Sequence, residues 1–154
     1  SREYVYTICS SRVRAPLLQG FALQVTYKFE IDEMNRACQE LEGEHDFISF
    51  AADGGWARDT RRTIYRAVFI REGKLVKFHI KANSFLTHQV RNTVGFLLGI
   101  GSGKQTIDEL KRIMAERKVG LAGPAVAPCG LCLTRVNYTA ELELKYENLF
   151  SQSG

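Results

Sequence analysis

The sequence lacks most features that would set it apart from an ordinary globular domain. It has no apolar run long enough to cross a bilayer and no leader with charged, apolar and small-residue parts. We therefore expect neither a membrane protein nor a secretory precursor, and a cytoplasmic location. No compositional bias points to disorder, and 154 residues with 45% hydrophobic side chains can bury one sizeable core.

The excess of positive over negative charge is small. The formal net charge is +4 and the isoelectric point is near 8.9. Such a value is compatible with a polyanionic partner, but it also describes many soluble proteins. Charge alone therefore does not decide between classes of function.

The sequence has four cysteines, and two of them, Cys129 and Cys132, have the C-x-x-C spacing. This spacing occurs in half zinc sites and in redox pairs. A second ligand pair is missing, and a strand-like run follows the motif where redox sites have a helix. We interpret the cysteines as reduced packing residues, with metal or redox use as the alternative, and expect no metal and no cofactor.

Hydrophobic periodicity predicts strands and helices without a regular alternation. We expect strands at residues 4–9, 62–70, 75–82 and 130–138, and helices at 31–41, at 85–100 and after the capping-box sequence that begins at Thr106. Residues 12–20 and 51–60 are predicted loops, the second a mobile surface loop around Trp56. A short polar turn at 71–74 makes an antiparallel hairpin of the second and third strands.

The strand at 75–82 alternates cleanly. Val76, Phe78, Ile80 and Ala82 make an apolar side, whereas Lys77, His79 and Lys81 lie on the other. One apolar side calls for one layer of helices. The predicted fold class is α+β, with a mainly antiparallel sheet and helices packed on one face.

The central helix has an unusual polar side. Around a helical wheel, Leu86, Val90, Val94, Leu97 and Leu98 form the core side, and the opposite side contains His88, Arg91, Asn92, Gly95 and Gly99. Two glycines in one helix cost up to about 1 kcal/mol each, which indicates close approach by another backbone or by a ligand. The spacing alone favours tight packing by a neighbouring helix or another part of a longer protein.

The segment 81–95 carries a resemblance. It contains A-N-x-F-x-x-H-x-V-R-N-x-V-G, which resembles a signature of the tRNA pseudouridine synthase A family. Weaker matches follow the family order: the Y-x-Y strand from Tyr4, G-x-H-D-F-x-S-F at 43–50, and G-L-Y-L at 130–133, where Cys132 replaces tyrosine. The resemblance covers residues 2–138 and leaves the tail unmatched.

The resemblance implies a cofactor-free isomerisation of uridine to pseudouridine in the anticodon stem-loop of tRNA, at the thirty-eighth to fortieth nucleotides. It makes Tyr4 the aromatic residue that stacks on the flipped uracil and moves a proton, and Arg91 the partner of the catalytic aspartate. Leu131 and Leu133 are then candidates for the apolar wall of the pocket. Further predicted substrate contacts, including cations that would meet phosphates, are His88, Asn92, Arg58, Arg61, Arg62 and Lys81.

The nucleophile of the family is absent. It lies in R-T-D-A-G-V-H, and no aspartate of this sequence has that context; the similar composition of residues 58–61 is a coincidence in a loop. In the family the motif precedes the Tyr4 strand. We therefore interpret residues 1–139 as the C-terminal domain of a synthase, inactive alone, and 140–154 as a tail of unclear structure.

The partners implied are tRNA, a missing N-terminal half and a second copy in a homodimer, with no membrane. The alternative is a non-catalytic RNA-binding or dimerisation module of the same fold. A weaker alternative is a protein-interaction domain that does not bind RNA.

Overall fold

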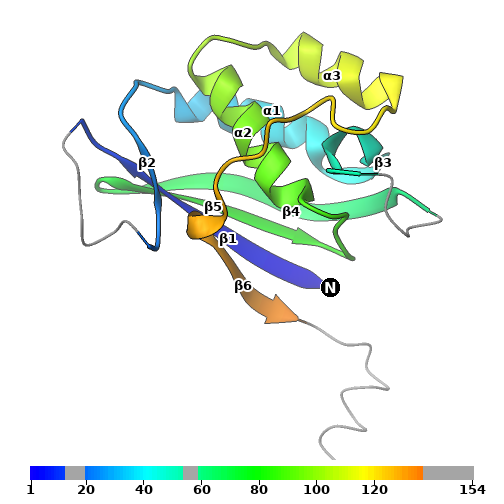
Figure 1. The fold of residues 1–154 in the computed structure, drawn as a ribbon, viewed down its shortest axis with the longest axis horizontal. Helices are drawn as coiled ribbons and strands as arrows, with labels where there is room; N and C mark the ends of the chain where they lie inside the picture. Colours follow the sequence, from blue (N-terminus) through cyan, green and yellow to red (C-terminus); the bar gives the residue numbers. More distant parts are fainter. Residues whose placement is uncertain (13–19, 54–58, 137–154) are drawn as a thin grey trace, which may run out of the picture.

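The computed structural model describes residues 1–12, 20–53 and 59–136, and it has the predicted α+β class (Figure 1). In these residues one sheet contains β1 (Arg2–Ser10), β2 (Leu23–Val25), β3 (Gly43–Asp46), β4 (Arg61–Glu72), β5 (Leu75–Ala82) and β6 (Leu131–Val136). The helices are α1 (Ile31–Leu41), α2 (Gln89–Gly101) and α3 (Ile107–Glu116), with single 3-10 turns η2 (Ile48–Phe50) and η3 (Pro128–Gly130).

The strands are ordered β2-β1-β5-β4-β3, with β6 also paired to β1. One edge of β1 pairs antiparallel with β5 along the whole stretch from Arg2 to Cys9. The other edge is shared, since β6 pairs antiparallel near Tyr4 and β2 pairs parallel near Ile8. The sequence did not predict β2, because three residues are too few for a periodic signal.

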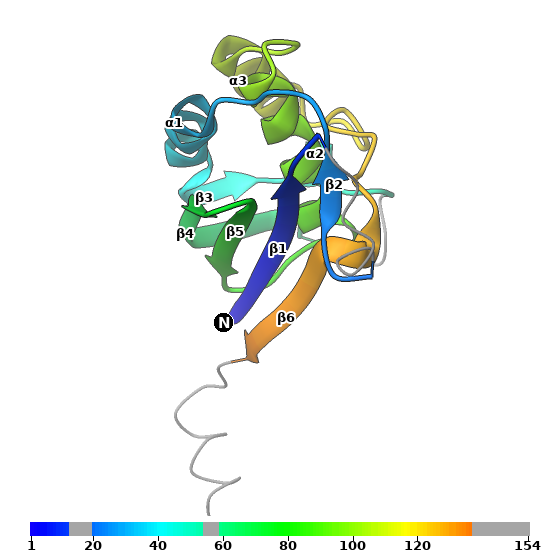
Figure 2. The same ribbon diagram turned by 90° about the vertical axis from the view of Figure 1, so that its left-hand side faces the viewer.

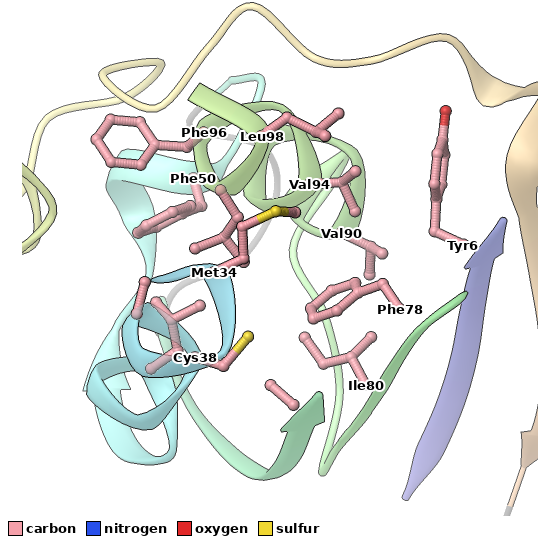
Figure 3. Packing of buried hydrophobic residues seen from close by; sticks show 14 of the residues in the cluster. Tyr6, Met34, Cys38, Phe50, Phe78, Ile80, Val90, Val94, Phe96 and Leu98 are labelled. Carbon is pink, nitrogen blue, oxygen red and sulfur yellow. The ribbon is translucent and has the colours of Figure 1, made fainter. Parts of the chain in front are cut away.

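All three helices cover one face of the sheet, as predicted (Figure 2). We call this side the helical face. It receives the predicted apolar side of β5, with Val76, Phe78 and Ala82 fully buried and Ile80 2% exposed. Figure 3 shows Phe78 and Ile80 in the same core cluster as Met34 and Cys38 of α1 and Val90 and Val94 of α2. The opposite side, which carries Lys77, His79 and Lys81, is the open face.

The predicted start of the central helix at Phe85 is wrong, because α2 begins at Gln89. His88 has a left-handed backbone with φ of 59°. The Gln89 side chain accepts a hydrogen bond from the Leu86 N–H at 2.9 Å, and the Leu86 carbonyl accepts the Gln89 N–H at 3.1 Å. These two bonds close a tight turn. The N–H and carbonyl groups that they use are then not available for the hydrogen bonds of a further helical turn before Gln89. The later start at Thr106 is confirmed, since its hydroxyl accepts the Glu109 N–H.

The predicted core side of α2 is confirmed, but the opposite side is not free. Asn92 was predicted to point away from the core, which is wrong: it is 4% exposed, and its amide donates to the Phe50 carbonyl at 2.7 Å. The glycines do allow close approach, by parts of this same chain. A Cβ at Gly95 would lie 2.8 Å from the Pro124 carbonyl oxygen, and one at Gly99 would lie 2.5 Å from the Gln105 side chain.

The cysteines are free, and Cys9 and Cys38 are buried as predicted. Cys132 is exposed, so its interpretation as a packing residue is wrong. Its strand lies at the edge of the sheet, where side chains find little to pack against. No cluster of three or more potential metal ligands occurs in the part of the chain described above. The same residues contain no helix with the length and apolar character needed to cross a membrane.

Candidate active site

A pocket of about 330 Å³ lies where α2 begins. β1 supplies Arg2 and Tyr4 to its wall, and the segment from Phe85 to Arg91 supplies most of the remainder. Pro128 and Leu131, which lie just before and at the start of β6, complete the wall of the pocket. The pocket therefore unites three segments that are far apart in sequence, and it contains the predicted Tyr4, His88, Arg91 and Leu131.

Tyr4 is placed by the alternation of β1, which turns it to the same side as the buried Tyr6. Its ring meets Phe85 edge to face, with centroids 5.3 Å apart and an interplanar angle of 81°. The ring is only half-buried, and the structure records no hydrogen bond for its hydroxyl among the residues it describes. Tyr4 therefore presents two features to a molecule that enters the pocket: an aromatic face held in place by Phe85, and a phenol hydroxyl without a recorded hydrogen-bond partner in the described chain.

Arg91 is held by the segment that precedes β6. Its Nε donates to the Val126 carbonyl at 2.9 Å, and the Val126 N–H donates to the Arg91 carbonyl at 3.3 Å. For the two terminal guanidinium nitrogens, no partner is recorded within the described ranges. An incoming carboxylate would therefore be met end-on by these two nitrogens, since Nε is already occupied.

The pocket has an unbalanced charge. Two arginines, Arg2 and Arg91, line it, and none of its described lining residues is acidic. The amino end of α2 adds a partial positive charge, because its first N–H groups have no helical partner. An anionic group is therefore favoured in this pocket.

The remaining predicted contacts lie elsewhere. Leu133 is paired with Tyr4 across the β1–β6 ladder but is 47% exposed and lies beyond the pocket wall. Asn92 is buried against Phe50, as described above. Arg58 falls outside the described residues.

The predicted phosphate contacts are dispersed and already have partners. Arg61 forms an ion pair with Glu44 at 3.0 Å, and Arg62 donates to the Asp59 carbonyl at 2.7 Å. Both begin β4, two strands away from β1. Lys81 lies on the open face, 3.7 Å from a carboxylate oxygen of Glu3.

Sequence reasoning missed Arg2, Phe85 and Pro128 as pocket residues. Arg2 lies two residues before Tyr4, so strand periodicity could have found it. Phe85 belongs to the recognised motif, but its role needed the contact with Tyr4. No local signal points to Pro128, which reaches the pocket through contacts of the segment before β6.

Gln89 was also missed. Its side chain is fully buried at the pocket, and Nε2 is a buried donor without a recorded partner in the described chain. Its oxygen is used by Leu86, so the amide orientation is fixed by that bond.

Comparison with known proteins identifies the family of the chain. The family described as tRNA pseudouridine synthase matches residues 37–139. The chain is 38% identical over 144 residues to tRNA pseudouridine synthase A of Janthinobacterium sp. (strain Marseille), covering 94% of this chain and 53% of the relative. Proteins of the same name from Neisseria gonorrhoeae (strain NCCP11945) and Streptococcus pneumoniae (strain 70585) are 39% and 35% identical over 89% and 90% of this chain.

The mixed sheet with its helical layer is consistent with the fold of the pseudouridine synthase class. The chain belongs to the tRNA pseudouridine synthase family. It spans about half the length of the curated relatives it matches, between 52 and 56% of each of the three.

Proposed function

We propose that the complete protein isomerises uridine to pseudouridine in the anticodon stem-loop of tRNA, at the thirty-eighth to fortieth nucleotides, and that this chain forms the C-terminal part of its active site. The observation that carries the proposal is that Tyr4 and Arg91 line one pocket whose described lining residues include no acidic side chain. The catalytic aspartate would come from the half that this chain lacks relative to its relatives, and the chain alone would be inactive.

Arg91 would receive this aspartate end-on. Two parallel hydrogen bonds to a carboxylate orient it, and the positive charge keeps it ionised as a nucleophile. Because the Val126 carbonyl holds Nε, the guanidinium would need little rearrangement when the carboxylate arrives. Such preorganisation is the contribution that the geometry of this chain supports best.

Tyr4 would hold the flipped base. Extrusion of a nucleotide from its stack costs a few kcal/mol, which stacking on an aromatic ring partly offsets. The unused phenol would also move a proton during the rearrangement. Leu131 would supply apolar contact on the pocket wall, and His88, exposed at the rim, would contact the substrate.

Contacts to RNA phosphates would come from outside the pocket. We propose Arg58, Arg61, Arg62 and Lys81 for this role, and for three of them the present bonds would have to yield to phosphate. Leu133 would extend the apolar wall along β6. The proposed assembly is a cytoplasmic homodimer on tRNA.

The test is Arg91→Ala in the complete protein, assayed by pseudouridine formation in tRNA. We expect kcat to fall by about a hundredfold or more, the scale of losing one preorganised charge contact at a reacting centre. Arg36→Ala is the matched control, because Arg36 is exposed on α1 and forms an ion pair with the half-exposed Glu33. Circular dichroism should show both variants folded.

Unchanged kcat in Arg91→Ala would refute the proposal. Binding of tRNA by the wild-type protein with no turnover would support the non-catalytic RNA-binding module instead. Absence of both activities would favour a domain for protein interactions.

A further inference from the structure

The segment of residues 123–130 lies along α2 and approaches it very closely. At Gly95 only glycine leaves room for the Pro124 carbonyl, which would be 2.8 Å from any Cβ. One turn earlier, Arg91 and Val126 exchange two hydrogen bonds, one from the guanidinium Nε and one from the Val126 N–H. The direction of the Arg91 guanidinium is therefore tied to the conformation of residues 123–130.

Tyr6 fastens the same segment from the sheet. Its ring is fully buried, and its hydroxyl donates to the Ala127 carbonyl, the residue after Val126. Figure 3 shows the ring standing at the margin of the core with its hydroxyl turned outward from the core. The segment also ends against this ring, since a Cβ at Gly130 would lie 2.9 Å from ring carbons of Tyr6 and 2.5 Å from the Thr7 carbonyl oxygen.

The Tyr6 hydroxyl is suited to a permanent donor role. Burial raises the pKa of Tyr6 well above its ordinary value, and the nearby Cys129 adds to that rise, while Arg91 opposes it. The phenol therefore stays protonated, and a hydrogen-bond donor, at neutral pH.

We propose that Tyr6 is a positioning residue of the pseudouridine synthase reaction, which acts through residues 123–130 to hold the Arg91 guanidinium in the pocket. The inference rests on the proposed function. Tyr6 itself does not line the pocket. It fixes the Ala127 carbonyl, and the neighbouring Val126 carbonyl fixes Nε of Arg91.

Loss of the Tyr6 hydroxyl should lower turnover rather than tRNA affinity, because turnover depends on the alignment of the groups at the reacting centre. Without the Tyr6 hydroxyl, residues 126–128 lose their fastening to β1, and the guanidinium samples directions that do not meet the carboxylate. Small misplacements of this kind lower turnover strongly, whereas the proposed phosphate contacts to tRNA among the described residues lie outside the pocket.

The experiment is Tyr6→Phe in the complete protein. We expect kcat to fall about tenfold with KM for tRNA unchanged, which corresponds to about 1.4 kcal/mol of transition-state stabilisation. The ring and its packing remain, so the variant should fold. Tyr65→Phe is the matched control, since Tyr65 is 53% exposed and does not line the pocket.

A double-mutant cycle separates positioning from general destabilisation. If Tyr6 acts through Arg91, then Tyr6→Phe has little further effect on kcat in an Arg91→Ala background. The same tenfold loss in that background, or a rise in KM without a fall in kcat, would overturn the proposal.

The proposed function is tested separately by the Arg91→Ala variant. Full loss in Arg91→Ala with wild-type kcat in Tyr6→Phe would leave the enzyme assignment standing and remove the role of Tyr6. A wild-type kcat in Arg91→Ala would refute both.

Discussion

The two faces of the sheet differ in what they hold, and β5 shows the difference residue by residue. Phe78 is fully buried on the helical face, while its neighbours Lys77 and His79 lie half-exposed on the open face. The pocket with Tyr4 and Arg91 belongs to the helical face. The open face instead carries ion pairs, Lys77 with Glu72 at 2.9 Å and Lys81 with Glu3 at 3.7 Å.

The proposed catalytic groups and the proposed phosphate contacts lie in different surroundings. Tyr4 and Arg91 lie in the pocket, where packing fixes them. Arg61 and Lys81, predicted to meet phosphates, already form ion pairs with carboxylates of the same sheet. Exposed ion pairs contribute at most about 1 kcal/mol, so a phosphate could displace them at small cost. The helical face should therefore govern stability and turnover, and the open face should have small effects on both.

The largest effect is expected at Phe78, whose ring stacks on Phe69 with centroids 4.5 Å apart. Phe78→Ala should lower the free energy of unfolding by about 3–5 kcal/mol, because it removes buried apolar contacts and leaves a cavity. His79→Ala, one residue along, should change it by less than about 0.5 kcal/mol. Urea unfolding measures both, and equal losses would break the comparison between the faces.

A smaller effect is expected where residues 123–130 contact α2. Gly95→Ala should cost about 1–3 kcal/mol of stability, because the new Cβ overlaps the Pro124 carbonyl and forces a backbone shift. The same shift should reduce kcat by moving Val126 away from Arg91. Gly20→Ala is the control, since among the described residues no atom other than those of its chain neighbours lies within 4 Å of the added Cβ. A Gly95→Ala variant with the stability and kcat of the wild type would contradict the close contact.

The faces should also respond differently to pH. Burial, with a smaller effect of Glu42, raises the pKa of Cys38 under the helical face to about 12. An unfolded thiol ionises near pH 9, so the unfolded state gains from alkali first, and stability present below that pH is lost as pH rises. We expect a loss of about 1 kcal/mol between pH 8 and pH 10, reduced in Cys38→Ala. Guanidinium unfolding across this range measures it, and an identical slope in the variant would exclude Cys38.

Acid should act on the open face instead. The hydrogen bond and charge of Lys77 lower the pKa of Glu72, so this pair contributes stability above the ordinary carboxyl pKa and loses it as pH falls. Comparing Glu72→Gln with the wild type in acid would show whether the pair contributes measurably.

The smallest expected effect is that of Lys81→Ala in the complete protein. If Lys81 meets a phosphate, KM for tRNA should rise about two- to threefold at constant kcat, and the slope of log affinity against log salt should fall by about one. An unchanged salt slope would remove Lys81 from the RNA surface. Lys74→Ala, in the exposed β4–β5 turn, is the control.

Sequence alone predicted what depends on local periodicity and on the recognised motif. The alternation of β5 identified both faces, and the family resemblance named Tyr4, His88, Arg91 and Leu131 as candidates, which line one pocket in the structure. Contacts between distant segments were not predictable in this way. Asn92 turned out buried because Phe50 covers it, and Pro128 reached the pocket because Gly95 and Tyr6 hold its segment. A helical wheel separates a core side from an opposite side, whereas other parts of the chain cover both sides of α2.

The pairing of β1 with β5 has a consequence for the two tyrosines of β1. Tyr4 and Tyr6 are two residues apart, so they lie on the same side of the sheet, and the register of the ladder from Arg2 to Cys9 makes this the helical face. A shift by one residue would carry both phenols to the opposite side, away from Phe85 and Ala127 alike. The alignment of β1 thus controls the position of Tyr4 and Tyr6 at once, and an insertion in β1 should displace both together from Phe85 and Ala127.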